Sequence, residues 1–153
     1  MSLADRLRGL GKVEELKDGV VSIEVPPEDL KRVAEALLEL GFDHLVNVEG
    51  VDLPSEGKIG LIYHASSYEG EFLGKLIALK TKLDRSSPKV ESLMDVWPNA
   101  IYMERETWEL LGIEFEGHPE LEHLLLPPWW SDMPPLRKEF KVKQEGYIVD
   151  LTR

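Results

Sequence analysis

The segment from Leu45 to Leu83, LVNVEGVDLPSEGKIGLIYHASSYEGEFLGKLIALKTKL, decides the fold because it holds three strand-forming runs. Turns rich in Pro, Ser, Glu and Gly separate the runs, which span Leu45–Leu53, Lys58–Ala65 and Phe72–Leu83. In the last run, apolar side chains and lysines fall on alternate sides, which indicates one buried and one wet face. Connections this short join antiparallel neighbours. We expect Gly50 to mark a bulge in the first run.

The segments before these runs predict one more strand and one clear helix. Val20–Val25 alternates like a strand. Pro27 then suits a helix N-terminus, and acidic residues follow it where the helix dipole favours anions. Apolar residues recur at helical spacing from Leu30 to Leu38, and Gly41 follows as the expected helix end. We expect a short helical or frayed start over Leu3–Gly11.

Two further helices are predicted after the three runs. Ser87 and Pro88 suit the cap and first position of a helix that ends near Asp95. Pro98 interrupts it, and a second helix extends from Asn99 to Leu111 before Gly112. The elements together predict an α+β fold, in which helices cover a mostly antiparallel sheet.

The chain from Glu114 onward differs in character from the rest. It carries five of the ten prolines and two of the four tryptophans, with little periodicity apart from a candidate strand at Gly146–Leu151. We therefore expect residues 1–112 to form the α+β domain. Residues 113–153 are expected to form a long extended C-terminal arm that packs on partner subunits.

Composition excludes several classes of function. Acidic residues outnumber basic ones by 29 to 18, so a general nucleic-acid binder is not expected. The chain has no cysteine, which excludes disulfides, thiolate nucleophiles and cysteine-ligated clusters in it. No apolar run approaches a membrane span, and no signal peptide is recognisable, so we expect a cytoplasmic location. One glutamine and two asparagines beside abundant Glu and Lys suggest a thermophilic source.

The predicted helix before Gly112 places a carboxylate among apolar side chains. Its residues at spacings of four, three, four and three share one face: Trp97, Ile101, Glu104, Trp108 and Leu111. A carboxylate between two indoles needs a cation or hydrogen-bond donors. We expect Glu104 to pair with Arg137. Arg105 and Glu109 could pair along an exposed face of the helix. Glu106 makes this face more acidic, and the face is then either a solvated surface or a docking surface.

Two histidines offer a metal-dependent alternative. His118 and His123 flank a Pro-Glu-Leu-Glu segment, and two histidines with nearby glutamates could hold zinc. The spacing differs from that of the H-E-x-x-H metalloproteases, and Pro119 opposes a helix that would align the rings. The more ordinary expectation is that His118 fixes a turn beside Gly117 by hydrogen bonds to the backbone. Paired carboxylates for hydrolysis carry little weight in so acidic a chain.

The arm contains more apolar residues than a domain of this size can easily bury. The segment Leu124–Trp130, LLLPPWW, cannot form regular structure across its prolines. Exposed apolar surface on a proline-stiffened segment is typical of a partner-binding site. A basic stretch follows it that could select an acidic patch on a partner: Arg137, Lys138, Lys141 and Lys143. The alternative is a tail packed on its own domain.

Two motifs resemble a known family. The segment Glu104–Leu121, ERETWELLGIEFEGHPEL, closely resembles the signature of the 30-kDa subunit family of respiratory complex I, NADH:quinone oxidoreductase. Pro135–Phe140, PLRKEF, resembles the end of the family's conserved region, and the resemblance covers about 30–140. Trp108 stands where a tyrosine is more usual, and Glu109 where an aspartate is. The family includes the equivalent subunit of archaeal membrane-bound nickel–iron hydrogenases.

The resemblance implies a non-catalytic structural and assembly subunit in the peripheral arm of a complex I-like, ion-translocating oxidoreductase. The implied partners are a hydrogenase-like large subunit and an iron–sulfur small subunit. Iron–sulfur clusters, with nickel–iron in the case of a hydrogenase, would lie in those partners and none in this chain. Other subunits would reach the membrane, so this chain would lie peripherally on its cytoplasmic face. The residues expected to organise the arm and its contacts are Glu104, Arg105, Glu106, Trp108, Gly117, His118, Pro119, Trp129, Trp130, Arg137 and Lys138.

Three alternatives stay open at the level of sequence. The short chain and its thermophile-like composition favour a membrane-bound hydrogenase or relative over NADH:quinone oxidoreductase proper. A standalone enzyme using carboxylates or zinc is a second alternative. A free protein-binding adaptor outside any redox complex is a third.

Overall fold

The computed structural model describes residues 2–123, 125–127, 129–130 and 133–140. The helices are α1 (Leu3–Leu7), α2 (Leu30–Glu39) and α3 (Ala100–Leu111), with 3-10 turns at Pro27–Asp29, Pro54–Glu56 and Gly70–Phe72. The strands are β1 (Lys12–Glu15), β2 (Val21–Glu24), β3 (His44–Leu53), β4 (Lys58–Ser66), β5 (Leu76–Asp84), β6 (Lys89–Glu91) and β7 (Glu114–Glu116). These elements confirm the predicted α+β class.

The main sheet has five strands in the order β1-β2-β5-β4-β3. β3, β4 and β5 form the predicted antiparallel meander, in which Tyr63 of β4 lies between Val48 and Leu79. β2 pairs with β5 in parallel, a feature that the sequence did not reveal. It arises because α2 carries the chain from β2 across the sheet to β3 at the far edge, as parallel crossovers require. The meander then returns β5 to the side of β2.

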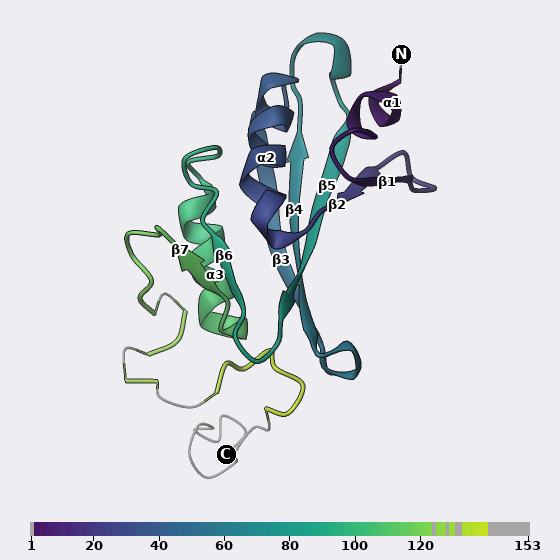
Figure 1. Cartoon of the computed structure of the whole chain (residues 1–153). Coiled ribbons are helices and arrows are strands. Elements are labelled where there is room, and N and C mark those ends of the chain that lie inside the picture. Colours follow the sequence, from purple (N-terminus) through teal and green to yellow (C-terminus); the bar gives the residue numbers. More distant parts are fainter. Residues whose placement is uncertain (1, 124, 128, 131–132, 141–153) are drawn as a thin grey trace, which may run out of the picture.

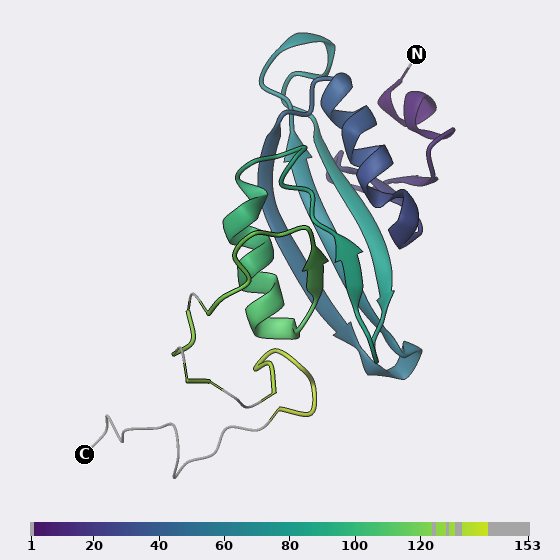
Figure 2. The same cartoon turned by 60° about the vertical axis from the view of Figure 1, so that its left-hand side comes forward.

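One face of the sheet carries the core. α2 and α3 cover the same face, with α1 beside α2 (Figures 1 and 2). α2 buries the apolar side that its spacing predicted, and α3 buries Ala100 at its start and Leu111 at its end. These side chains pack in one cluster with inward-facing residues of the strands, such as Leu61, Tyr63 and Leu79.

Gly50 allows α3 to pack closely against β3. The strand bulges between Leu45 and Asn47, so the expected bulge at Gly50 was wrong. A Cβ on Gly50 would collide with the Leu111 side chain and lie 3.3 Å from Thr107 Cγ2. The glycine therefore serves helix packing and not a break in strand pairing.

The segment after β5 differs from the prediction. The helix expected from Pro88 to Asp95 is absent from the described residues, and Lys89–Glu91 is the strand β6. It pairs in parallel with β7, and Val90 and Phe115 are buried opposite each other. The Pro88 carbonyl also accepts the Glu114 N–H at 2.9 Å. Tertiary pairing with β7, which sequence analysis missed, has overridden the local helix signal.

Within the predicted arm, 113–153, residues Glu114–Glu116 form β7, and the described part that follows returns toward the end of the sheet (Figure 1). Its last described stretch, 133–140, lies near the C-terminal end of α3, where Leu136 N donates to Leu110 O at 2.8 Å. The candidate strand at Gly146–Leu151 lies outside the described residues, as do Lys141, Lys143, Leu124 and Pro128.

Candidate functional site

Glu104 forms the buried centre of the site. Its side chain projects from α3 into the core with no exposed surface. The carboxylate accepts hydrogen bonds from Tyr63 Oη (2.5 Å), Ser92 Oγ (2.5 Å) and the Leu93 N–H (2.8 Å). Burial raises the pKa of Glu104, and these hydrogen bonds oppose that rise. The carboxylate joins α3, β4 and the segment after β6.

The predicted Glu104–Arg137 pair was wrong. Glu104 receives its hydrogen bonds from neutral donors, and Arg137 lies at the C-terminal end of α3. There its Nε donates to the Leu111 carbonyl at 2.6 Å. A cation at this position satisfies a terminal carbonyl and faces the negative end of the helix dipole. Gly112 suits this helix end because its φ is 81° and because a Cβ there would lie 3.1 Å from Pro134 Cγ.

The outer side of α3 holds the beginning of the arm. Arg105 donates through Nε to the Glu122 carbonyl (2.6 Å) and through Nη2 to the His123 carbonyl (2.9 Å). Glu109 accepts the N–H groups of Leu125 (2.8 Å) and Leu126 (2.5 Å). Glu109 is buried, so the expected exposed Arg105–Glu109 pair was wrong. Each of the two side chains binds backbone groups of the arm.

His118 fixes the turn that starts the arm. Its Nδ1 accepts the Glu120 N–H at 3.1 Å, so Nε2 carries the proton and donates to the Ile101 carbonyl at 2.7 Å. The expected turn-fixing bond is confirmed. Gly117 has a φ of 84°, which favours glycine over residues with a side chain. Pro119 is exposed beside them.

A second anchor holds the other end of the described arm. Arg85 donates two hydrogen bonds to the Asp52 carboxylate, from Nε (2.6 Å) and Nη2 (2.8 Å), and also pairs with Glu139. Asp52 accepts the Lys138 N–H at 2.8 Å. The Asp52 side chain is 1% exposed. The Arg85 guanidinium, assisted by the Lys138 N–H, holds the pKa of Asp52 at about 2.

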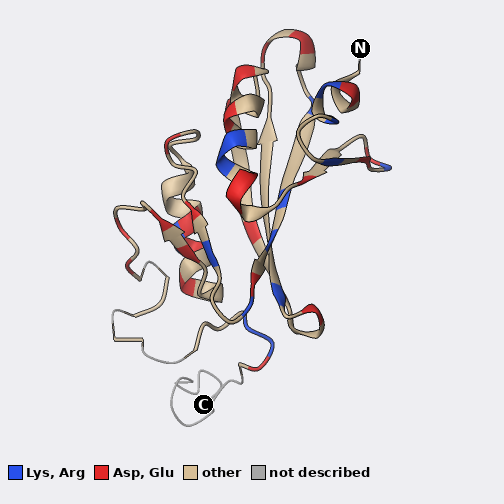
Figure 3. Ribbon diagram, viewed as in Figure 1, with Lys and Arg blue, Asp and Glu red and all other residues tan. Residues whose placement is uncertain are grey.

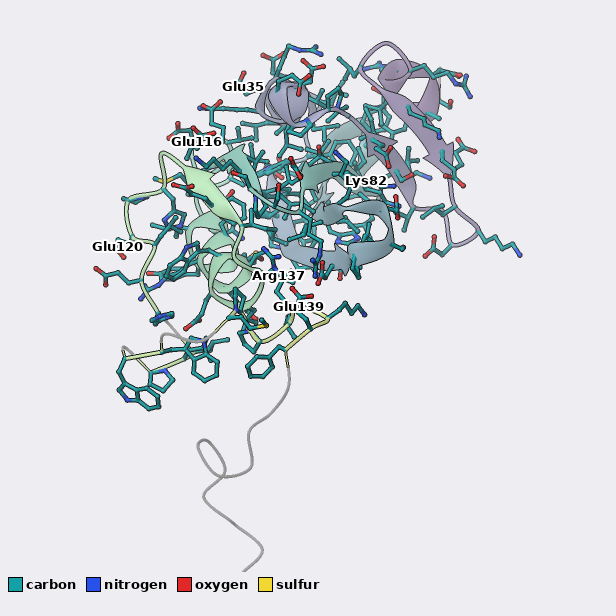
Figure 4. The ribbon with its side chains drawn as sticks, turned by 60° about the horizontal axis from the view of Figure 1, so that its bottom comes forward. Glu35, Lys82, Glu116, Glu120, Arg137 and Glu139 are labelled. Atoms are coloured by element: carbon teal, nitrogen blue, oxygen red, sulfur yellow. The ribbon has the colours of Figure 1, made fainter. Side chains whose placement is uncertain are left out.

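This anchor was missed as a functional site, although β3 contains a signal for it. Asp52 falls on the inward face of its strand, in register with buried Ile59. A carboxylate at an inward position requires a partner. The partner Arg85 follows β5, whose last residue Asp84 pairs with Lys58 in the sheet. Figure 4 shows Arg137 and Glu139 close to this end of the sheet.

Between the two anchors, the arm exposes large apolar side chains. Those most exposed among the described residues of the arm are Leu125, Trp129, Met133 and Leu136. Trp129 is 69% exposed. Trp130 is half-buried, with its ring 6.0 Å from that of Phe140. We call the four exposed side chains the apolar arm surface.

The side chains of the remaining predicted site residues take no part in either anchor. Trp108 is half-buried, with its ring 5.4 Å from that of His123. Glu106 is exposed, and the Lys138 side chain is exposed although its N–H binds Asp52. Within the described ranges, no group of three or more His, Cys, Asp or Glu residues could hold a metal ion. No helix of that same part of the chain is long and apolar enough to cross a membrane.

Comparison with known proteins identifies a matching family profile and two relatives that are similar in sequence. The profile of the family described as "Respiratory-chain NADH dehydrogenase, 30 Kd subunit" matches residues 23–146. The C subunit of F(420)H(2) dehydrogenase from Methanosarcina mazei is 42% identical over 118 residues, which cover 76% of this chain and 73% of that protein. The C subunit of NADH-quinone oxidoreductase from Moorella thermoacetica is 37% identical over 135 residues, covering 86% and 88%.

Two solved structures share the fold. The trypsin-resistant fragment of Nqo5 matches with a TM-score of 0.67 and 27% identity, covering 76% of this chain and 92% of the fragment. A chain of the membrane-bound sulfane sulfur reductase, an archaeal respiratory membrane complex, matches with a TM-score of 0.78 and 24% identity. That second match covers 96% of this chain and 92% of the other.

Proposed function

Because this chain belongs to the 30-kDa subunit family of respiratory-chain NADH dehydrogenase, we propose that it is a non-catalytic assembly subunit in the peripheral arm of a complex I-like, ion-translocating oxidoreductase. The relatives named above are each the C subunit of a dehydrogenase or quinone oxidoreductase. The observation that carries the proposal is the apolar arm surface, which the domain presents between two anchors.

The chemistry of the buried polar groups supports a structural role. Glu104 accepts from three donors of its own chain, and both ring nitrogens of His118 bind backbone groups. Arg105 and Glu109 bind the backbone of the arm. These side chains are committed to holding the fold, whereas a standalone enzyme would need some of them turned toward a substrate.

The proposed partners are a hydrogenase-like large subunit and an iron–sulfur small subunit, which would carry the redox centres. Large, exposed Trp and Leu side chains are typical of residues that become buried at an interface. In the proposed assembly, other subunits reach the membrane, and this chain lies peripherally on the cytoplasmic face. We favour a membrane-bound hydrogenase or a relative, with NADH:quinone oxidoreductase as the alternative.

Purification from native membranes through an affinity tag on this chain tests the proposal. We expect other subunits to co-purify, together with iron. Nickel in stoichiometric amount would support the hydrogenase, whereas iron without nickel would support the quinone-reductase alternative. Recovery of the chain alone, or with a stoichiometric metal bound to it, would contradict the assembly role.

A further inference from the structure

The hairpin between β4 and β5 lies at the opposite end of the molecule from the arm (Figures 1 and 2). β4 has nine residues, so the two ends are roughly 30 Å apart at about 3.4 Å per residue. A partner seated on the apolar arm surface would therefore leave this hairpin free to make other contacts.

The hairpin exposes two large apolar side chains. Tyr68 is 65% exposed and Leu73 is 62% exposed. The Gly74 N–H donates to the Ser67 carbonyl at 2.9 Å, which brings the neighbouring residues 68 and 73 together across the loop. Gly41 lies against Ser67, since a Cβ there would be 3.5 Å from Ser67 Oγ.

The base of the hairpin is firmly packed. The Phe72 ring stacks on Phe42, with ring centroids 5.8 Å apart. The Arg6 guanidinium lies 5.5 Å from the Phe72 ring centroid and pairs with Glu71 at 3.1 Å. The Tyr68 ring lies 4.8 Å from that of His44. A surface that is ordered before binding loses less conformational entropy when a partner docks.

Exposed acidic residues lie on the hairpin and at the end of α2 that leads into β3. Glu39, Asp43 and Glu69 are exposed, and none forms an ion pair with another described residue. Figure 3 shows acidic residues gathered along the hairpin and at the nearby end of α2. Lys75 adds one exposed cation to the loop, so acids remain in excess. We call this surface the hairpin tip; it consists of Tyr68, Leu73, Glu39, Asp43 and Glu69.

We propose that the hairpin tip is a second docking surface, which binds a protein surface carrying lysines or arginines around an apolar pocket. Tyr68 and Leu73 would fill the pocket, and the three exposed carboxylates would face the surrounding cations. With the arm at the other end, the chain then bridges two contact sites about 30 Å apart.

The charge of the tip argues against other occupants. Anionic lipid headgroups and nucleic acids would be repelled by the acidic groups. A second copy of this chain docking tip to tip would place like charges opposite each other, which is unfavourable. A polypeptide surface with basic residues around an apolar pocket would complement both the apolar and the acidic side chains of the hairpin tip.

Site-specific photo-crosslinking in the assembled complex tests this inference. A benzophenone amino acid would replace Leu73 in one variant and Trp129 in another, with the exposed Lys17 position as the control. Complexes isolated through the tagged chain would be irradiated in about 0.05 M and about 0.5 M NaCl, the latter shortening the Debye length to roughly 4 Å. Crosslinked peptides would be identified by mass spectrometry.

We expect position 73 to crosslink to a segment of another polypeptide that is rich in Lys and Arg. The yield should fall at high salt, and also in a Glu39→Lys, Glu69→Lys variant. A crosslink to an acidic or uncharged segment, to lipid or to a second copy would overturn the inference. The inference would also be overturned if position 73 formed no crosslink while position 129 still did. If neither position formed a crosslink, the assembly role would be contradicted as well.

Discussion

Replacing Asp52 by asparagine should release the end of the arm. The substitution keeps the size of the side chain but removes the charge that binds Arg85 and the Lys138 N–H. The pKa of Asp52 is about 2, against 3.8 for a free aspartate. At about 1.36 kcal/mol for each pKa unit, this difference corresponds to about 2 kcal/mol of stability.

The same pKa gives the pH dependence of this stabilisation. Because the pKa of Asp52 is lower in the folded than in the unfolded chain, its contribution is present above about pH 4. It is lost as the pH falls toward 2. Urea unfolding should show that Asp52→Asn is about 2 kcal/mol less stable at pH 7, and that the difference shrinks below pH 4.

Trypsin offers a local readout, because it cleaves after Arg137 and Lys138. If the interactions removed in Asp52→Asn are the ones that hold the arm in place, trypsin should cleave there up to about 30-fold faster in this variant. The control is Glu56→Gln, which removes an exposed carboxylate paired with Lys82 and should change stability by less than about 1 kcal/mol. Unchanged unfolding and unchanged cleavage in Asp52→Asn would refute the anchor.

Three further expectations concern other contacts. Glu104→Ala should lower the free energy of unfolding by about 3–5 kcal/mol, because it leaves buried donors without an acceptor. Its effect should add to that of Arg137→Ala; strong coupling between the two in a double-mutant cycle would instead support a Glu104–Arg137 pair. Gly50→Ala should cost about 1–3 kcal/mol in thermal unfolding, because its Cβ meets Leu111, while Gly60→Ala, whose nearest neighbour lies at 3.7 Å, should cost less; equal costs would argue against the close packing of α3. Glu109→Gln should speed hydrogen exchange at the Leu125 and Leu126 amides roughly tenfold, and unchanged exchange would mean that Glu109 does not hold the arm.

Sequence analysis predicted the elements that depend on local pattern. The 3.6-residue spacing from Leu30 identified α2, alternation identified β2 and β5, and the turn-rich segments between the runs separated β3, β4 and β5. It failed where distant segments decide the conformation. The Ser-Pro signal at Pro88 favoured a helix, but pairing of Val90 with Phe115 makes the segment a strand.

The candidate site shows the same division. Helical spacing correctly indicated that Glu104 is buried, yet its donors come from Tyr63 and Ser92, which no local pattern links to it. The arm looked like an extended tail because prolines interrupt it. Its return to Asp52 depends on a backbone hydrogen bond from residue 138, which carries no signal in the side-chain sequence.

The central claim is that the apolar arm surface joins this chain to other subunits. Native mass spectrometry of complexes isolated through the tagged chain tests it most directly, using Trp129→Asp and, as a matched control, Tyr102→Asp on the exposed side of α3. We expect Trp129→Asp to be recovered without the partner that binds the apolar arm surface and Tyr102→Asp to retain that partner. Recovery of the full complex with Trp129→Asp would contradict the claim.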